Sequence, residues 1–312
     1  MSDDPIVQLY PTATPAGAAG VGAASMGAAG MGAAGAGAAG VGAADMGAAG
    51  GGAAGWSAAG VGAARTPGAL TDTDLLALYA PAERSVPSVR ANFISSIDGS
   101  ATAGGLSGGG LSSGLGAPAD KRVFDLQRQL CDVVLVGAGT VRSEGYGAML
   151  LGPDARSWRV ANGLPEHPTF AIVSGRLDLD PASDVFAKAP VRPVVLTARS
   201  AGAAKRKELE RVADVVDCGE TRVDAEALIA ALTARGLLRV HCEGGPSLLG
   251  SLVAADLLDE LCLTVSPALE GGAGPRIVTA GGKAIALRPM GLDHVLLAGS
   301  MLLTKYSRRR RG

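Results

Sequence analysis

A five-residue repeat rich in glycine and alanine occupies residues 17–64, and it most constrains what this chain can fold into. Its units run GAAGV, GAASM, GAAGM and onward, and they contain 17 of the 47 glycines of the chain. Such small side chains bury too little apolar surface to offset the conformational entropy that folding removes. We therefore expect residues 1–66 to form a disordered extension. The folded domain is expected at residues 67–307, with a basic tail at 308–312.

Charge and cysteine content exclude several classes of protein. The formal net charge of the 312 residues is −1, whereas nucleic-acid-binding proteins usually carry a basic face. Glycine and alanine are too weakly apolar to make the repeat a membrane span, and no secretory signal is visible at the start. The four cysteines form no CxxC pair, which favours reduced thiols over disulfides or a zinc site. We expect a cytoplasmic protein without a metal site that binds neither nucleic acid nor membrane.

Apolar runs alternate with helical patterns through residues 70–306, and this predicts an α/β fold. We expect strands at 89–97, 131–136, 169–174, 194–197, 215–218 and 239–243, and helices at 117–130, 205–212, 224–235 and 247–255. The last part of the chain changes to strands at 261–265, 294–297 and 301–306. The predicted architecture is a mostly parallel sheet with helices on both faces and an antiparallel C-terminal edge.

Three loops follow predicted strands, at the edge of the sheet where open α/β proteins bind ligands. They lie at 92–99, 136–145 and 241–247. In the third loop, Gly244 and Gly245 would let a ligand approach the backbone closely. The helix that follows would begin at Pro246 and present unpaired N–H groups to an anion. A pyrophosphate fits this arrangement, although the same residues would also make a bare turn between strand and helix.

The second loop resembles the start of a dinucleotide-binding fingerprint without completing it. Gly137 and Gly139 are present, whereas Arg142 stands at the third glycine position. Thr140 could cap a short helix and offer N–H groups to a phosphate. Glu144 follows as either a reactive carboxylate or a solvated loop residue.

Three sequence blocks together resemble the pyrimidine reductase family of riboflavin biosynthesis. They are NFISSIDG at 92–99, DVVLVGAGTVRSE at 132–144 and EGGPSLLGSLVAADLLDELCLTVSPALEGG at 243–272. That family is the reductase half of a bifunctional deaminase–reductase, and it has a dihydrofolate-reductase-like fold. The resemblance implies NADPH-dependent reduction of the ribosyl group of 5-amino-6-(5-phosphoribosylamino)uracil to a ribityl chain. It also suggests a homodimer, with strand 261–265 either at the interface or in the core.

The resemblance further assigns roles to single residues. Asn92, Arg128 and Glu243 match positions that contact the substrate. Glu144, which stands where the family usually has Asp, would stabilise the cation that develops on the substrate. Protons would pass through Glu144, Asp98 or water. The cofactor would contact the backbone of Ile94 at its nicotinamide end and Ser174 at its adenosine end. It would also contact Gly137, Thr140, Gly244, Gly245, Pro246, Ser247, Leu248 and Leu249.

Two other functions stay open at this point. The stretch from Tyr146 to Leu151, which contains Met149-Leu150-Leu151, is apolar where the family has a phosphate-binding arginine. That departure favours an NADPH-dependent reductase of another heterocycle, such as dihydrofolate or a dihydropterin. The other alternative is a non-catalytic scaffold that acts through the Gly/Ala repeat.

Overall fold

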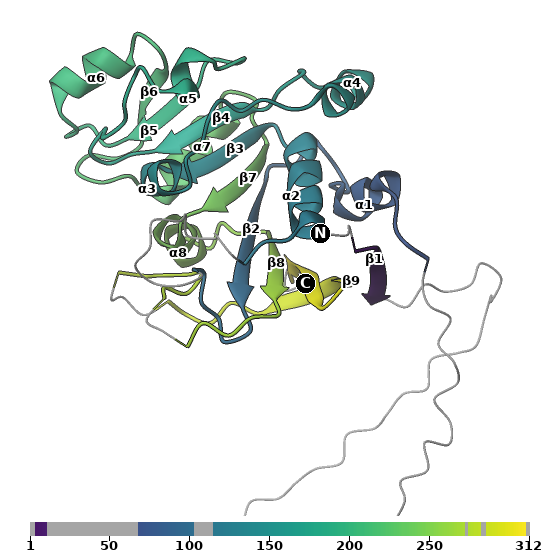
Figure 1. Ribbon diagram of the computed structural model, residues 1–312. Coiled ribbons are helices and arrows are strands. Elements are labelled where there is room, and N and C mark those ends of the chain that lie inside the picture. Colours follow the sequence, from purple (N-terminus) through teal and green to yellow (C-terminus); the bar gives the residue numbers. More distant parts are fainter. Residues whose placement is uncertain (1–3, 11–67, 103–114, 272–273, 282–284, 310–312) are drawn as a thin grey trace, which may run out of the picture. The chain divides into compact units, whose positions relative to one another are not determined.

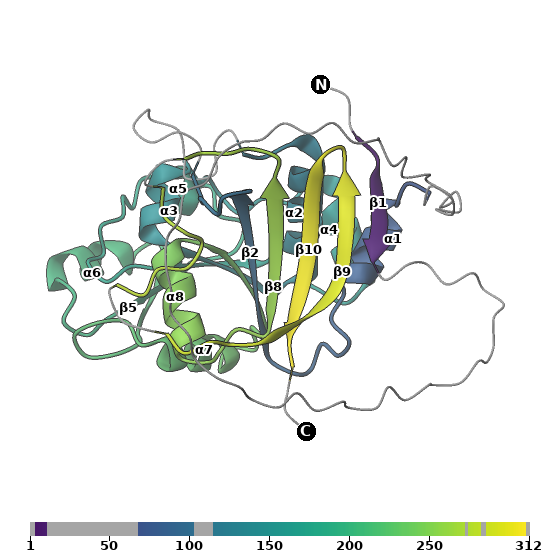
Figure 2. The same cartoon turned by 90° about the horizontal axis from the view of Figure 1, so that it is seen from below.

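The structure is a computed structural model that describes residues 4–10, 68–102, 115–271, 274–281 and 285–309 (Figures 1 and 2). The Gly/Ala repeat, and with it the expected disorder and the scaffold hypothesis, lies outside the described residues. Among the helices that are described, none is long and apolar enough to cross a membrane.

A ten-stranded sheet organises the fold, in the order β1-β9-β10-β8-β2-β7-β3-β4-β5-β6. The seven strands from β8 to β6 in this order run parallel, and β10, β9 and β1 add an antiparallel edge beside β8. The strands are β1 (Ile6–Tyr10), β2 (Ser88–Ser96), β3 (Val133–Gly137), β4 (Thr169–Val173), β5 (Val194–Thr197), β6 (Asp214–Asp217), β7 (Arg239–Gly244), β8 (Glu260–Ser266), β9 (Met290–Ala298) and β10 (Met301–Arg308).

Helices cover both faces of this sheet. They are α1 (Asp72–Tyr79), α2 (Pro118–Leu130), α3 (Ala138–Ser143), α4 (Pro153–Ala161), α5 (Asp184–Ala187), α6 (Ala203–Leu209), α7 (Ala225–Thr233) and α8 (Pro246–Ala254). The apolar residues of α7 and α8 pack on one face, and those of α1, α2, α3, α5 and α6 pack on the other. Figure 2 shows α8 in front of the sheet and α1 and α2 behind it.

Local sequence explains where the central elements begin and end. Residues 133–136 (VVLV) are fully buried, as expected for a parallel strand covered on both faces. Pro118 stands in the first turn of α2, where its missing N–H costs no helical hydrogen bond. The side chain of Asp224 accepts a hydrogen bond from the Ala227 amide and so caps α7. The mixed α/β architecture predicted from the sequence is therefore confirmed.

Two ends of the chain differ from the expectation. Ile6–Tyr10, which we placed in the extension, forms β1 and pairs with β9 at the edge of the sheet. Its β-branched residues Ile6 and Val7 suit a strand, and Ile6 is fully buried between α1 and β9. Arg308, which we placed in the basic tail, ends β10 and pairs with Asp256.

Residues 261–265 lie inside the sheet as part of β8. Hydrogen-bonded strands flank it on both sides, β10 on one and β2 on the other. Leu261 and Leu263 are partly buried against the apolar cluster of α7 and α8, and Cys262 is buried on the opposite face. The segment is therefore an internal strand of the sheet, and its expected role at a subunit interface stays a prediction.

Candidate functional site

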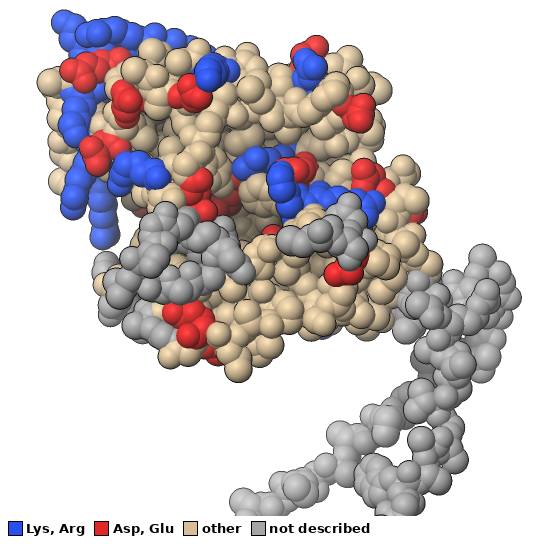
Figure 3. All heavy atoms as spheres, viewed as in Figure 1, with Lys and Arg blue, Asp and Glu red and all other residues tan. Residues whose placement is uncertain are grey.

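A cavity of about 690 Å³ opens at the carboxyl ends of β2, β7 and β3. Helix α2 forms one wall, and the segment from α3 to Met149 and the start of α8 form others. Figure 3 shows it as a hollow in the middle of the molecular face, with Lys and Arg side chains along one side. Of the fifteen predicted site residues, nine line this cavity: Asn92, Ile94, Arg128, Thr140, Glu144, Glu243, Gly244, Gly245 and Pro246.

Glu243 and Arg128 form a buried ion pair in the cavity wall. Two parallel hydrogen bonds join them, from Arg128 Nε to Oε1 at 2.6 Å and from Nη2 to Oε2 at 2.7 Å. The Tyr146 hydroxyl donates a third hydrogen bond to Glu243 Oε2, at 2.9 Å. The Arg128 guanidinium also lies 4.3 Å from the centre of the Phe124 ring. The two predicted substrate-contacting residues thus hold each other in place.

Electrostatic interactions keep Arg128 and Tyr146 each in one protonation state at neutral pH. Burial alone would lower the pKa of Arg128, but the carboxylate of Glu243 raises it above its usual value. Burial, followed by the negative charge of Glu243, raises the pKa of Tyr146. Arg128 therefore stays charged, and Tyr146 keeps the proton that it donates.

The turn between β7 and α8 approaches α3 so closely that only glycine fits. A Cβ atom on Gly245 would stand 2.7 Å from Thr140 Oγ1. Gly244 has a φ of +123°, a conformation that side chains other than glycine rarely adopt. The Gly244–Gly245 peptide bond is cis. The backbone of β7 and the hydroxyl of Thr140 are thereby brought together at the cavity surface.

Not every residue of the predicted cofactor run faces this surface. The amides of Leu248 and Leu249 both donate to Gly245 O, at 3.0 and 3.1 Å. The Leu249 side chain is fully buried in the core, so it does not contact a ligand in the cavity. Ser247 is exposed beside Thr279, with which its hydroxyl shares a 3.3 Å hydrogen bond. The residues of this turn that line the cavity are therefore Gly244, Gly245 and Pro246.

Three further predicted residues lie away from the cavity lining. Asp98 accepts hydrogen bonds from Ser96 and from the amides of Glu270 and Gly271, and these lower its pKa to about 2. Gly137 supports the turn from behind, since a Cβ there would meet Gly245 N at 3.5 Å. Ser174 is buried at the end of β4, where its carbonyl accepts a hydrogen bond from Thr197.

The lining residues that were not predicted include Asp120, Lys121, Phe124 and Tyr146. The first three stand on α2, a helix whose sequence pattern shows only that it is amphipathic. Tyr146 was included in a stretch described as apolar, because nothing nearby in sequence shows that its hydroxyl reaches Glu243. The glycine at 145 just before it is the one local signal of a turn that could aim this side chain.

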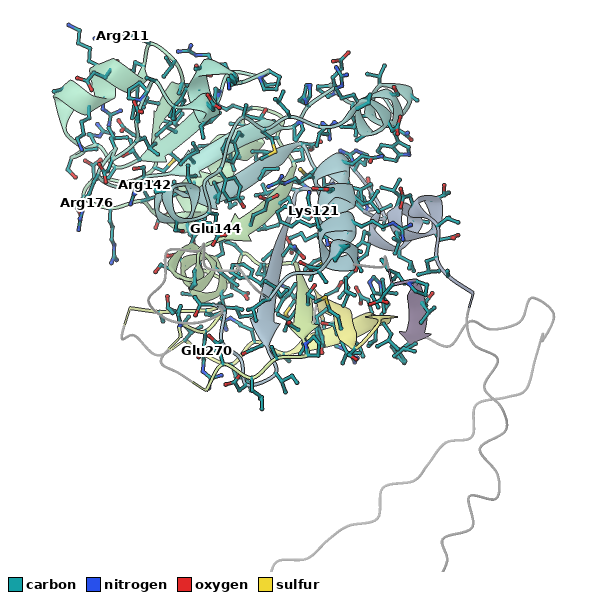
Figure 4. The ribbon with its side chains drawn as sticks, viewed as in Figure 1. Lys121, Arg142, Glu144, Arg176, Arg211 and Glu270 are labelled. Carbon is teal, nitrogen blue, oxygen red and sulfur yellow. The ribbon has the colours of Figure 1, made fainter. Side chains whose placement is uncertain are left out.

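A basic cluster extends the site along the carboxyl edge of the sheet. Arg142 on α3 donates a 2.8 Å hydrogen bond to the carbonyl of Asp178, and Lys205 Nζ lies 3.5 Å from an Asp178 carboxylate oxygen. Arg176 stands two residues earlier, in the turn after β4, and has no ion-pair partner within the described residues. Figure 4 shows Arg142 and Arg176 close to each other at the end of the molecule away from α2.

The donor groups of the cavity suit an anion better than a metal. Within the described ranges, no group of three or more His, Cys, Asp and Glu side chains could hold a metal ion. The tight cradle of Gly244, Gly245 and Thr140 instead places backbone and a hydroxyl where a phosphate could approach. A parallel sheet with such a strand-to-helix turn at its carboxyl edge is typical of α/β proteins that bind nucleotides.

Comparison with known proteins identifies the family. The model of the RibD C-terminal domain matches residues 87–296. A 2,5-diamino-6-ribosylamino-4(3H)-pyrimidinone 5′-phosphate reductase of Archaeoglobus fulgidus is 31% identical over 153 residues, which are 49% of this chain and 69% of that protein. A protein of the same name from Methanothermobacter thermautotrophicus is 30% identical over 162 residues, or 52% of this chain and 70% of that protein. The chain belongs to the RibD C-terminal domain family, as its sequence blocks predicted.

Solved structures show the same fold. A pyrimidine reductase-like protein from Corynebacterium diphtheriae superposes with a TM-score of 0.66 and 26% identity, over 72% of this chain and 93% of that one. The riboflavin biosynthesis reductase Rib7 of Saccharomyces cerevisiae superposes with a TM-score of 0.54 and 18% identity, over 75% of this chain and 97% of that one.

Proposed function

We propose that this chain is an NADPH-dependent reductase that converts the ribosyl group of a 6-ribosylaminopyrimidine 5′-phosphate to a ribityl group. Family membership supports the proposal, because the two curated relatives are named for reducing such a compound. The observation that carries it is the cavity, which gathers nine of the fifteen predicted residues. Two substrates share this chemistry: 5-amino-6-(5-phosphoribosylamino)uracil and the 2,5-diaminopyrimidinone in the names of the relatives.

The cofactor's phosphates fit the turn between β7 and α8. Helix α8 begins at Pro246, which has no amide proton. Because this residue lines the cavity, the positive end of the helix dipole faces the cavity. Thr140 offers a hydroxyl across the narrow gap to Gly245. When bound, the reduced nicotinamide would supply a hydride to C1′ of the substrate.

The basic cluster supports NADPH over NADH. A cofactor that starts at the turn of β7 and crosses the ends of β3 and β4 would reach Arg142 and Arg176 with its adenosine half. Within the described residues, the carboxylate beside Arg142 and Lys205 is that of Asp178. The cluster of Arg142, Arg176 and Lys205 therefore keeps a net positive charge that suits an additional phosphate.

A direct binding measurement tests this preference. We expect Arg176→Ala to weaken NADPH binding about tenfold, as for a lost charge-assisted hydrogen bond, while NADH binding stays unchanged. Arg211→Ala, an exposed arginine that follows α6, serves as the matched control. Equal weakening of both cofactors, or of neither, would contradict the assignment.

On the substrate side, Lys121 is placed to hold the 5′-phosphate. It lines the cavity from α2, and its present partner Asp125 lies 2.6 Å away on the same helix. Both side chains are exposed, so this ion pair contributes little and can be exchanged for a phosphate. Lys121 would thus take over the role that the apolar stretch 149–151 does not supply.

The half-buried carboxylate of Glu144 has an electrostatic role in this scheme. Opening the ribosylamine ring places positive charge on the C1′–nitrogen bond, and a fixed negative group in the cavity stabilises that charge. The two hydrogen bonds between Arg128 and Glu243 would fix the cavity wall, and the pyrimidine would be positioned against that wall.

Turnover with defined substrates tests the whole proposal. Purified full-length protein should oxidise NADPH in the presence of one of the two ribosylaminopyrimidine phosphates, with the ribityl product identified by mass spectrometry. Turnover of dihydrofolate alone would favour the second candidate, for which Met149 in the cavity wall is the supporting observation. No turnover of any of these substrates by a chain that binds NADPH would refute the proposal.

We also propose that the protein acts as a homodimer in the cytoplasm. Its relatives' biosynthetic substrate supports the location, and light scattering on the purified chain tests the oligomeric state. A mass of one chain across micromolar concentrations would rule the dimer out.

A further inference from the structure

Asp120 is a carboxyl group in the cavity to which the proposed function gives no role. It stands in the first turn of α2, is half-buried and lines the cavity. The buried Thr264 donates a 2.6 Å hydrogen bond to Oδ1. The second oxygen, Oδ2, lies 3.7 Å from the position of a Cβ on Gly116, which is also in the cavity wall. One oxygen is thus anchored to the sheet, and the other lies beside the cavity surface.

Strand register places this carboxyl group at one particular end of the cavity. Thr264 on β8 is directly opposite Ile94 on β2. Paired residues of neighbouring strands have Cβ atoms about 5 Å apart, so Asp120 sits above the neighbour of Ile94. Ile94 is the residue expected beside the nicotinamide ring. Asp120 therefore lies near the reacting end, whereas Thr140 and Gly245 stand at the phosphate end.

We propose that the Asp120 carboxyl group is the acid that protonates the ribose ring oxygen when the substrate ring opens. This inference rests on the proposed function and adds a catalytic residue to it. As the C1′–O4′ bond breaks, its electron pair goes to O4′, which takes the proton from Asp120. The exocyclic nitrogen forms a double bond to C1′, and the hydride from the reduced nicotinamide then adds to C1′. The Asp120 carboxylate regains its proton from water, so each turnover consumes one hydride and one proton.

The environment of Asp120 supports a group that holds its proton. Burial raises its pKa above the usual value for Asp, and the hydrogen bond from Thr264 opposes this shift only in part. Other titratable or charged groups line the same cavity, namely Lys121, Arg128, Glu144, Tyr146 and Glu243. The neighbouring elements add Tyr79 on α1, Arg90 on β2, Glu260 and Cys262 on β8, and Arg122 and Asp125 on α2. A raised pKa lets a carboxyl group hold its proton to higher pH, and this is the property that general acid catalysis needs.

A purely structural role for Asp120 has to be separated from this one. An acidic residue in the first turn of a helix interacts favourably with the helix dipole, typically by less than 1 kcal/mol. Asp154 also stands in the first turn of a helix, α4, just after a proline, and is exposed. Asp154→Asn is therefore the matched control for the loss of a first-turn charge.

The test compares Asp120→Asn with the wild type and with Asp154→Asn, under saturating NADPH and substrate. For Asp120→Asn we expect kcat to fall at least 100-fold, which is within the range for loss of a general acid. NADPH affinity, followed by fluorescence, should stay within twofold. The wild-type kcat should decline as the pH rises above the pKa of Asp120, and this decline should be absent from the residual activity of the variant. A kcat within threefold of the wild type, or the same decline with pH, would overturn the inference.

A second variant keeps the test decisive if Asp120→Asn folds poorly. Thr264→Val retains the carboxyl group but removes the hydrogen bond that lowers its pKa. The alkaline decline of kcat should then move to higher pH, and an unmoved decline would refute the role of Asp120. Failure of the proposed function is distinguishable, because the wild type itself would then reduce neither pyrimidine, and this would remove the inference as well.

Discussion

The carboxylate of Glu243 joins three walls of the cavity. It stands on β7 and accepts hydrogen bonds from Arg128 on α2 and from Tyr146 after α3. Since this side chain is fully buried, Glu243→Gln leaves the Arg128 guanidinium without its counter-ion. We predict a loss of about 3 kcal/mol in the free energy of unfolding, which urea denaturation would measure.

Its control is an ion pair of the same type at the surface. Glu220 lies 3.4 Å from Arg199, and their side chains are 76% and 69% exposed. Glu220→Gln should change the free energy of unfolding by less than about 1 kcal/mol. Similar small losses for both variants would show that the buried pair contributes no more than a surface pair.

Asp98 makes stability depend on pH. The Ser96 hydroxyl and the amides of Gly271 and Glu270 lower its pKa to about 2, below the value of about 3.9 in an unfolded chain. A lowered pKa stabilises the folded state above about pH 4, and that contribution disappears as the pH falls towards 2. We predict that Asp98→Asn lowers Tm at pH 7, and that its difference from the wild type shrinks between pH 4 and pH 2.

Thermal melts across this pH range check the prediction. Asp154→Asn provides the reference, because this carboxylate is exposed in the first turn of α4. A Tm difference for Asp98→Asn that stays constant from pH 7 to pH 2 would contradict it.

At the level of elements, the start of α8 depends on the distance between β7 and α3. A methyl group on Gly245 would stand 2.7 Å from Thr140 Oγ1 and force the two segments apart. We predict that Gly245→Ala weakens NADPH binding at least tenfold in a fluorescence titration, since the cradle for the phosphates opens.

Gly139 supplies the matched control for that substitution. It lies one residue from Thr140 within α3, and a Cβ there would meet nothing within 4 Å. Gly139→Ala should leave NADPH binding unchanged and stabilise the helix slightly. Equal losses of affinity in both variants would point to a general effect of added methyl groups in this region.

The central elements were predictable because their signals are local. Residues 133–136 form a continuous apolar run, and Gly244-Gly245-Pro246 marks the turn into α8. The helix α1, with its capping box of Thr71 and Asp74, and the helix α4 were not expected, since both pack against α2, which is distant in sequence. Short helices owe their stability to packing, which the sequence pattern does not show.

The site was predictable in part for the same reason. Glu144 and Glu243 lie in sequence blocks that identify the family, so they were found. The cavity roles of Tyr146 and Asp120 depend on partners 97 and 144 residues away, namely Glu243 and Thr264. No local pattern encodes such distances, and only the assembled sheet brings these pairs together.

At the scale of the whole molecule, the fold includes a strand that precedes the Gly/Ala repeat. Ile6 is fully buried among residues of α1, β9 and β10, and its carbonyl accepts a hydrogen bond from Leu70. We predict that Ile6→Ala lowers the free energy of unfolding by about 3 kcal/mol in urea denaturation. Leu9→Ala, at a position 40% exposed, should cost less than about 1 kcal/mol. Equal costs at both positions would show that β1 is not packed in the sheet.

The pairing of β1 with β9 also has a consequence for synthesis of the chain. Among the described strands, β1 (Ile6–Tyr10) is made before all others, whereas its partner β9 (Met290–Ala298) is made after all others except β10. The strand β1 must therefore wait, unpaired, until β9 has emerged from the ribosome, whereas β3 and β4 can pair much earlier. Closure of this edge is a late event that depends on contacts of long sequence separation, which form slowly.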